Sequence, residues 1–291
     1  MRIRPLLTGL LLAVAVIVPT QALPATAAGV PTVTAISVAS GSTTGGTVVT
    51  VTGTNFVGVS GVNFGAGANA AAGTKISVAS TTKLTVTSPA HAAGRLNIRV
   101  ITTAATSAIV DADVFTYVAP PTLSKISPAT GTVAGGETVS LVGGNLSGLT
   151  VTVDGFTVPA TYAPTGIATI QMPAHASGQV TVLVTTVGGS TSATYTYYGQ
   201  PVITSITPSS GPTTGGTGIT VQGIELGSMY KVTIGGQDLG SPYFYTIGKP
   251  GVGLQMPAHA AGTFNLEITT LGGVTVASDV TTFTYVDPAA K

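Results

Sequence analysis

Cysteine and tryptophan are both absent from the 291-residue sequence, and only 7% of its residues are charged. Without cysteine the chain has no disulfide framework and no thiolate metal site, so we expect a fold that is indifferent to redox conditions. Lys and Arg are scattered, which argues against a nucleic-acid partner, because phosphate binding requires clustered cations. No apolar run of membrane-spanning length follows the N-terminal segment 1–28, so we expect no stable membrane anchor.

The N-terminal segment 1–28 has the three parts of a secretory signal peptide. Two arginines precede an apolar run over residues 6–18, and small residues follow at 25–28. The run is short for a bilayer span, which favours cleavage after Ala27 or Ala28 over a retained N-terminal anchor. We therefore expect a secreted, extracellular protein, free or associated with the cell surface. The mature chain would carry eight Lys and Arg against nine Asp and Glu, a formal charge of −1.

Three segments of the remaining chain share one order of motifs. Each starts with a proline, passes through a glycine pair into an alternating strand, reaches a Pro-Ala-His turn and closes on an aromatic-Thr-Tyr sequence. The motifs are Pro31, Pro121 and Pro201; Gly45-Gly46, Gly135-Gly136 and Gly215-Gly216; His91, His175 and His259, which are equally spaced; and Phe115-Thr-Tyr117, Tyr195-Thr-Tyr197 and Phe283-Thr-Tyr285. The repeats predict three domains, residues 29–119, 120–199 and 200–291, after a signal peptide at 1–28.

Alternation of Val, Ile and Leu with polar residues predicts β-strands throughout the repeats, and no sustained helical period occurs. In the second repeat seven strands are expected, at 122–127, 138–143, 149–154, 157–162, 167–172, 179–185 and 191–198. Seven short strands separated by turns are typical of a two-sheet sandwich. We predict an all-β protein of three tandem immunoglobulin-like β-sandwich domains, each with a core of facing aliphatic residues and the closing aromatic pair.

The motif order resembles the IPT/TIG domain, an immunoglobulin-like fold, over nearly all of the mature chain. The second and third repeats match most fully, through Ile126-Ser-Pro128 and Ile206-Thr-Pro208. The first repeat departs from the pattern with Ile36-Ser-Val38 and an Ala/Gly-rich insertion over residues 65–73. Family members occur in plexin-type receptor ectodomains, certain transcription factors, exported bacterial proteins and polysaccharide-acting enzymes. The resemblance therefore implies a fold and no particular activity.

The titratable residues predict neither catalysis nor cofactor binding. The three histidines occupy equivalent turns of separate domains, too far apart to share one metal ion, so we expect each imidazole to hydrogen-bond turn carbonyls. No Gly-x-Ser-x-Gly motif occurs, and the nine acidic residues form no pair that recurs between repeats. Asp111 and Asp113 leave two interpretations open, a shared calcium ion or solvated residues on one strand face. We predict no catalytic residue, no metal site, no cofactor and no enzymatic activity.

The third repeat alone is rich in tyrosine, with Tyr230 and the sequence Ser241-Pro-Tyr-Phe-Tyr-Thr246. In an extended strand Tyr243 and Tyr245 point to one face and Phe244 to the other. Such a pair could stack on a sugar ring, or it could simply cover an edge of the sandwich. We predict that Tyr230, Tyr243 and Tyr245 contact any ligand that this domain binds.

Short junctions that contain proline, at residues 118–121 and 198–201, predict domains held nearly end to end in a short rod. A rod of non-catalytic sandwiches outside the cell suits adhesion, with an extracellular protein, the cell envelope or a polysaccharide as partner. The alternative is a carbohydrate-binding accessory protein that acts through the third domain. Unpaired strand edges also make self-assembly conceivable.

Overall fold

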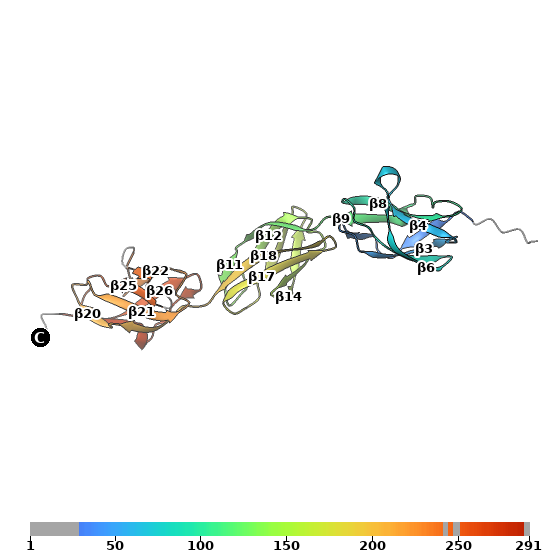
Figure 1. Ribbon diagram of the computed structural model, residues 1–291. Helices are drawn as coiled ribbons and strands as arrows, with labels where there is room; N and C mark the ends of the chain where they lie inside the picture. Colours follow the sequence, from blue (N-terminus) through green and yellow to red (C-terminus); the bar gives the residue numbers. More distant parts are fainter. Residues whose placement is uncertain (1–28, 241–243, 247–250, 288–291) are drawn as a thin grey trace, which may run out of the picture.

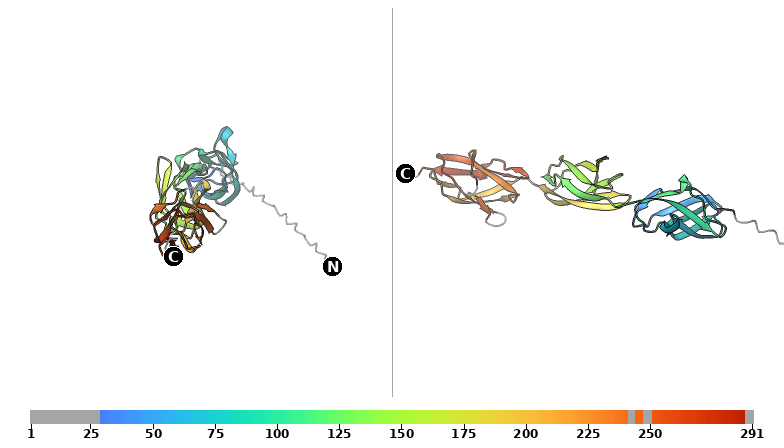
Figure 2. Two further views of the ribbon diagram at one scale, coloured as in Figure 1. Left: turned by 90° about the vertical axis from the view of Figure 1, so that its left-hand side faces the viewer. Right: turned by 90° about the horizontal axis from the view of Figure 1, so that it is seen from above.

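The computed structural model describes residues 29–240, 244–246 and 251–287, which form three β-sandwiches in a row (Figure 1, Figure 2). The predicted all-β, immunoglobulin-like fold is confirmed, because these residues form paired sheets and only three short 3-10 helices. The predicted signal peptide, residues 1–28, lies outside the described residues. Within the described ranges, no helix is long and apolar enough to span a bilayer.

The first sandwich has two sheets with the orders β1-β3-β7-β6 and β2-β9-β8-β4-β5. Strand β2 pairs with β9 in parallel, whereas the other neighbours are antiparallel. The elements are β1 (Thr32–Ile36), β2 (Ser40–Ser42), β3 (Val48–Thr54), β4 (Val59–Phe64), η1 (Gly67–Asn69), β5 (Ala71–Ala72), β6 (Thr74–Ser80), β7 (Lys83–Thr87), β8 (Gly94–Thr102), η2 (Asp111–Asp113) and β9 (Val114–Val118).

The second sandwich repeats this topology in the orders β10-β12-β16-β15 and β11-β18-β17-β13-β14. Its strands are β10 (Thr122–Ser127), β11 (Thr130–Thr132), β12 (Thr138–Gly144), β13 (Thr150–Val153), β14 (Phe156–Val158), β15 (Ala160–Ala163), β16 (Ile167–Gln171), β17 (Gly178–Thr186) and β18 (Gly189–Tyr198). Strands β17 and β18 form one long hairpin here, where the first sandwich has the turn η2 before its last strand.

The third sandwich has the orders β19-β21-β25-β24 and β20-β28-β26-β22-β23, and β27 pairs with β26 beside the second sheet. Its elements are β19 (Val202–Thr207), β20 (Ser210–Pro212), β21 (Gly218–Ile224), β22 (Met229–Ile234), β23 (Gln237–Asp238), β24 (Phe244–Thr246), β25 (Gly251–Gln255), β26 (Gly262–Thr270), β27 (Gly273–Val274), η3 (Asp279–Thr281) and β28 (Thr282–Val286). Like the first sandwich, it has a 3-10 turn before the last strand.

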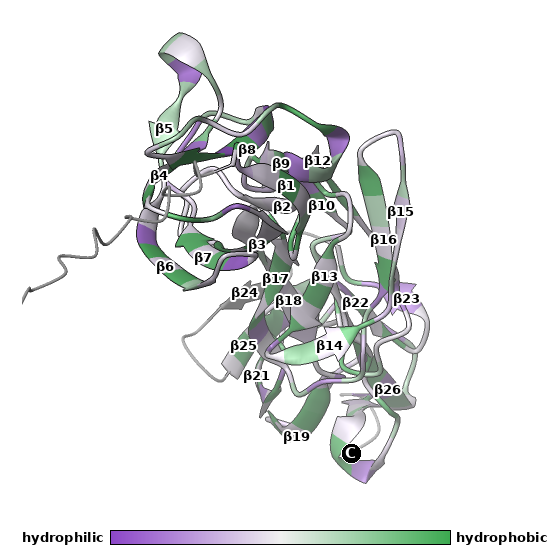
Figure 3. Ribbon diagram, turned by 90° about the vertical axis from the view of Figure 1, so that its right-hand side faces the viewer, coloured by the Kyte–Doolittle hydropathy of each residue, from purple (hydrophilic) through white to green (hydrophobic). Residues whose placement is uncertain are grey.

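Each sandwich encloses its own hydrophobic core, and apolar and polar residues alternate along its strands (Figure 3). The closing aromatic pair lies in each core as predicted. In the second sandwich, for example, Tyr195 and Tyr197 are at most 1% exposed and their rings meet edge to face at 5.0 Å. The alternation places every second side chain between the sheets, so a single strand supplies both members of the pair.

One strand predicted in the second repeat is wrong. Residues 157–162 were expected to form a single strand, but the chain ends β14 at Val158 and starts β15 at Ala160. Strand β14 pairs with β13 in one sheet, whereas β15 pairs with β16 in the other. Pro159 lies at the break, and its missing N–H suits a point where the chain leaves one sheet ladder for the opposite one.

Both junctions between sandwiches are braced by the tip of a hairpin. At the first junction, Ser42 Oγ of the first sandwich donates a hydrogen bond of 2.8 Å to the Gly188 carbonyl, between β17 and β18. At the second, Gln200 Nε2 donates a bond of 3.0 Å to the Val274 carbonyl on β27. The tip glycines Gly188 and Gly272 pack directly on the preceding linker backbone. These contacts hold consecutive sandwiches end to end.

Candidate functional site

The histidine turn recurs in all three sandwiches with nearly the same geometry. Each imidazole lies on the ring of the last core tyrosine, with centroids 5.2 Å apart for His91 and 5.1 Å apart for His175 and His259. Each Nδ1 also bonds the carbonyl of the following alanine, at 2.9, 2.9 and 3.3 Å in chain order. The predicted hydrogen bond to a turn carbonyl is confirmed, and the ring also covers the aromatic end of the core.

Only His175 has an acidic partner among the described residues. Its Nε2 lies 3.2 Å from Asp154 Oδ2, at the turn between β13 and β14. The bond to the Ala176 carbonyl and the neighbouring carboxylate of Asp154 raise the pKa of His175. Both partners are acceptors, so both bonds are made fully only by the protonated imidazole. The pair is exposed to solvent, so we assign it no large share of stability.

The core tyrosine differs between sandwiches in one hydrogen bond. Tyr117 and Tyr197 donate to the carbonyls of Pro89 and Pro173, at 2.9 and 2.7 Å. The Tyr285 hydroxyl is buried and has no partner among the described residues. Burial raises the pKa of Tyr117 to about 12, so this phenol remains a donor at neutral pH.

This difference gives a test within one molecule. Tyr197→Phe is expected to lower the free energy of unfolding of the second sandwich by about 1 kcal/mol, because the Pro173 carbonyl loses its donor. Tyr285→Phe is expected to be nearly neutral in the third sandwich, because its hydroxyl makes no bond there. Amide hydrogen exchange of β17 and β26 in the whole protein measures both effects. Equal losses in the two sandwiches would contradict the assignment.

Asp113 fits neither interpretation that the sequence left open. It belongs to the 3-10 turn η2 and is fully buried, so it is not a solvated residue on a strand face. One carboxylate oxygen accepts a hydrogen bond from Asn97 Nδ2, and the other accepts from the Val110 N–H at 3.2 Å. Burial raises its pKa, and these two hydrogen bonds partly offset that effect. Among the described residues, no three acidic or histidine side chains gather as metal ligands.

Two of the three predicted tyrosines, Tyr230 and Tyr245, belong to different sheets. Tyr230 lies on β22 and is 62% exposed. Tyr245 belongs to β24, which pairs with β25 in the opposite sheet. Tyr243 lies outside the described residues. A joint contact of the three with a ligand remains a prediction.

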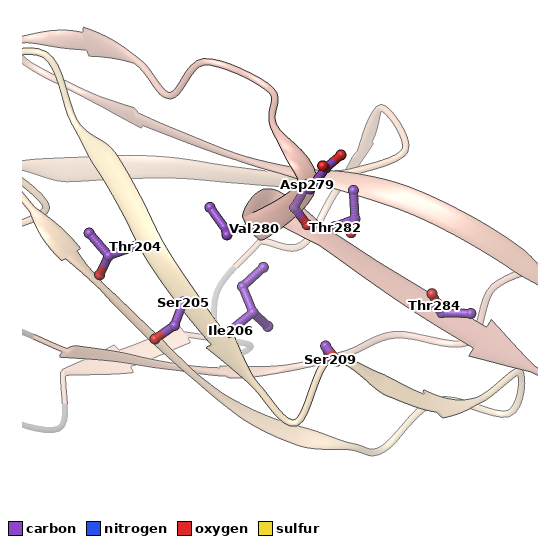
Figure 4. Close-up of a pocket in the computed structure, with 8 residues that line it drawn as sticks. All are labelled: Thr204, Ser205, Ile206, Ser209, Asp279, Val280, Thr282 and Thr284. Carbon is purple, nitrogen blue, oxygen red and sulfur yellow. Dashed lines mark hydrogen bonds between the residues drawn. The ribbon is translucent and has the colours of Figure 1, made fainter.

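A polar groove on the third sandwich was missed in the sequence. It lies where β19 leaves one sheet and β20 joins the other, and it has a volume of about 260 Å³ (Figure 4). One wall comes from β19 and the loop before β20, and the other from η3 and β28. The lining residues are Thr204, Ser205, Ile206, Ser209, Asp279, Val280, Thr282 and Thr284. Two walls from opposite ends of the repeat, rich in serine and threonine and with one aspartate, therefore line the same space.

The comparisons with known proteins concern the fold. The IPT/TIG domain model matches residues 31–117, 121–198 and 201–285. No curated protein sequence matches the chain. Solved structures with a similar chain path include the extracellular region of plexin A4, a protein named SGBP-B from a xyloglucan utilization locus in Bacteroides uniformis, and invasin, titled a bacterial integrin-binding protein.

These structures are distant. Plexin A4 is 17% identical with a TM-score of 0.37, and the match covers 89% of this chain and 24% of plexin. SGBP-B is 17% identical with a TM-score of 0.28, and the match covers 82% of this chain and 66% of SGBP-B. Invasin is 12% identical with a TM-score of 0.34, and the match covers 88% of this chain and 60% of invasin. The chain thus spans only part of each protein. With TM-scores below 0.5, these likenesses carry no argument about this chain.

Proposed function

Since the chain belongs to the IPT/TIG domain family over three consecutive matches, we propose that it is a non-catalytic binding protein that acts outside the cell as a rod of immunoglobulin-like sandwiches. Its role is adhesion, to an extracellular protein or to the cell envelope. The observation that carries this proposal is the bracing of both junctions by hairpin tips. A braced row keeps its two ends apart, which suits a protein that must reach from one surface to another.

The first test is cosedimentation of the protein, produced from its full sequence, with envelope material from its producer and with a panel of insoluble polysaccharides. Saturable binding to the envelope that a protease treatment of the envelope abolishes would support a protein receptor. Binding that survives this treatment would point to a glycan. Absence of saturable binding to every material would contradict the adhesive role.

The second candidate is a carbohydrate-binding accessory protein that acts through the third sandwich. One observation favours it, because Tyr230 presents a largely exposed ring on β22, where it could stack on a sugar. We expect that Tyr230→Ala, or the double change Tyr243→Ala and Tyr245→Ala, weakens glycan retention severalfold. Phe156→Ala is the matched control, since this aromatic is 71% exposed but lies on the second sandwich. An equal loss in the control would point to non-specific adsorption.

A further inference from the structure

The groove between β19 and β28 contains polar groups that the fold itself does not use. Among the described residues, no hydrogen-bond partner exists for the hydroxyls of Thr204, Ser205 and Ser209 or for the carboxylate of Asp279. In Figure 4, Ile206 and Val280 lie between the two walls, and the polar side chains surround them. We propose that this groove is a binding site for one or two neutral sugar residues of an extracellular glycan.

The chemistry of the lining selects this class of ligand. Serine and threonine hydroxyls both donate and accept hydrogen bonds, as sugar hydroxyls do, and the carboxylate of Asp279 accepts from two adjacent hydroxyls. Val280, which is 48% exposed, offers apolar contact for the C–H face of a sugar ring, beside the nearly buried Ile206. No cationic side chain lines the groove, so an anionic ligand would meet Asp279 without a compensating charge.

The corresponding positions of the first sandwich are mostly apolar. Both first strands carry the same bulge, between Val33 and Ala35 in β1 and between Ile203 and Ser205 in β19, which aligns Ser205 with Ala35. The carbonyls of Ala39 and Ser209 accept equivalent bonds from Thr116 and Thr284, which aligns these two residues. Thr282 likewise replaces Val114. The fold thus needs no hydroxyl at these positions, and the hydroxyls collect on the third sandwich.

This inference rests on the proposed role of the protein as a binding module, and it names the ligand class and the site. The groove is small and open, and no aromatic ring lines it. We therefore expect a dissociation constant of ~1 mM for a single sugar ring, which clustering of many copies on one surface would strengthen. The site is separate from Tyr230, which lies on β22.

The test is a titration of isotope-labelled protein, produced from its full sequence, with glucose, galactose, mannose, xylose and short oligosaccharides of each, followed by NMR. Concentrations reach roughly 20 mM, well above the ~1 mM expected for the site. We expect the amide signals of Ser205, Ser209 and Val280 to shift with at least one sugar. The double change Ser205→Ala and Ser209→Ala is expected to weaken that binding at least about tenfold, because two hydrogen bonds to the sugar are lost.

The first sandwich shows that alanine fits both positions, and an otherwise unchanged NMR spectrum confirms that the variant is folded. The matched control is Ser177→Ala with Ser192→Ala, two exposed serines of the second sandwich, which should leave binding unchanged. Signal shifts confined to the surroundings of Tyr230, or no shift with any sugar, would overturn the proposal that the groove binds sugar. If no sugar shifts the groove signals while the protein still cosediments with the envelope, the sugar-binding role of the groove is refuted and the adhesive role stands.

Discussion

Replacing Gly188 and Gly272 with alanine is expected to release both junctions and turn the braced row into loosely linked sandwiches. A Cβ on Gly188 would overlap the carbonyl group of Ala119, and one on Gly272 would overlap that of Gly199. Backbone atoms form both sides of each contact, so no side chain can move away. Overpacking of this kind costs about 1–3 kcal/mol, more than the roughly 0.5–1.5 kcal/mol of a single hydrogen bond such as that between Ser42 and Gly188. The junction should therefore yield before the sandwich does.

Small-angle scattering measures this change, because loosely linked sandwiches have no single maximum dimension, whereas the braced row has one. Because the chain has no cysteine, single cysteines at exposed Thr81 and Ser177 can also carry spin labels across the first junction. The distribution of their distances should broaden in the Gly188→Ala protein. Gly227→Ala is the matched control, because a Cβ there meets no atom within 4 Å. An unchanged distance distribution for Gly188→Ala would show that the hairpin tip does not fix the junction.

The repeats explain why so much of the fold could be predicted. Equal spacing of His91, His175 and His259 indicated three copies of one unit, and alternation identified the longer strands. The first strand of the second repeat, residues 122–127, was predicted with the bounds that it has in the structure. Motifs that recur in three copies carry information about packing that a single copy would not.

Short elements that change sheets were missed for a physical reason. Strands β2, β11 and β20 have three residues each and pair in parallel with the last strand of their sandwich. Three small residues such as Ser40–Ser42 are too few to show an alternation of polar and apolar side chains. The break at Pro159 was missed for a similar reason. The sequence shows the proline, but it does not show that the residues before and after it belong to different sheets.

The groove was missed because its two walls come from opposite ends of the third repeat. Neither wall is distinctive alone, since exposed serine and threonine are common throughout the chain. A comparison between repeats would have found it, because Ser205 and Ser209 replace Ala35 and Ala39. The tyrosines were noticed for their number, but strand alternation could not show that β22 and β24 belong to different sheets.

The second large effect concerns Asp113, the buried carboxylate of the first sandwich. Asp113→Ala is expected to lower the free energy of unfolding of that sandwich by roughly 1–3 kcal/mol, because the Asn97 amide and the Val110 N–H lose their acceptor. Val110 immediately precedes η2, so the loss should also loosen the turn that leads into β9. Hydrogen exchange of the β8 and β9 amides in the whole protein, measured at increasing denaturant, gives the change.

The third sandwich supplies the control substitution. Thr281 occupies the equivalent position, where its hydroxyl accepts from the Ser278 N–H at 2.9 Å, donates to the Ser278 carbonyl at 2.7 Å and lies 3.2 Å from Asn265 Oδ1. A threonine hydroxyl at this position can thus accept from the Val110 N–H and from the Asn97 amide nitrogen while it donates to the Val110 carbonyl. Asp113→Thr is therefore expected to cost less than about 1 kcal/mol. A cost equal to that of Asp113→Ala would mean that the negative charge, and not the hydrogen bonds, holds the turn.

Aspartate and threonine at position 113 also predict different responses of stability to pH. Burial raises the pKa of Asp113 in the folded protein, so the folded state holds this proton more tightly than the unfolded state does. The contribution of the carboxyl to stability is then largest below its unfolded pKa of about 4 and declines as the pH rises through the folded pKa. Threonine does not titrate, so the first sandwich of the Asp113→Thr protein should lose this decline. Denaturant unfolding of both proteins at a series of pH values, read from the β8 amides, separates the cost of burying the charge from the gain of its hydrogen bonds.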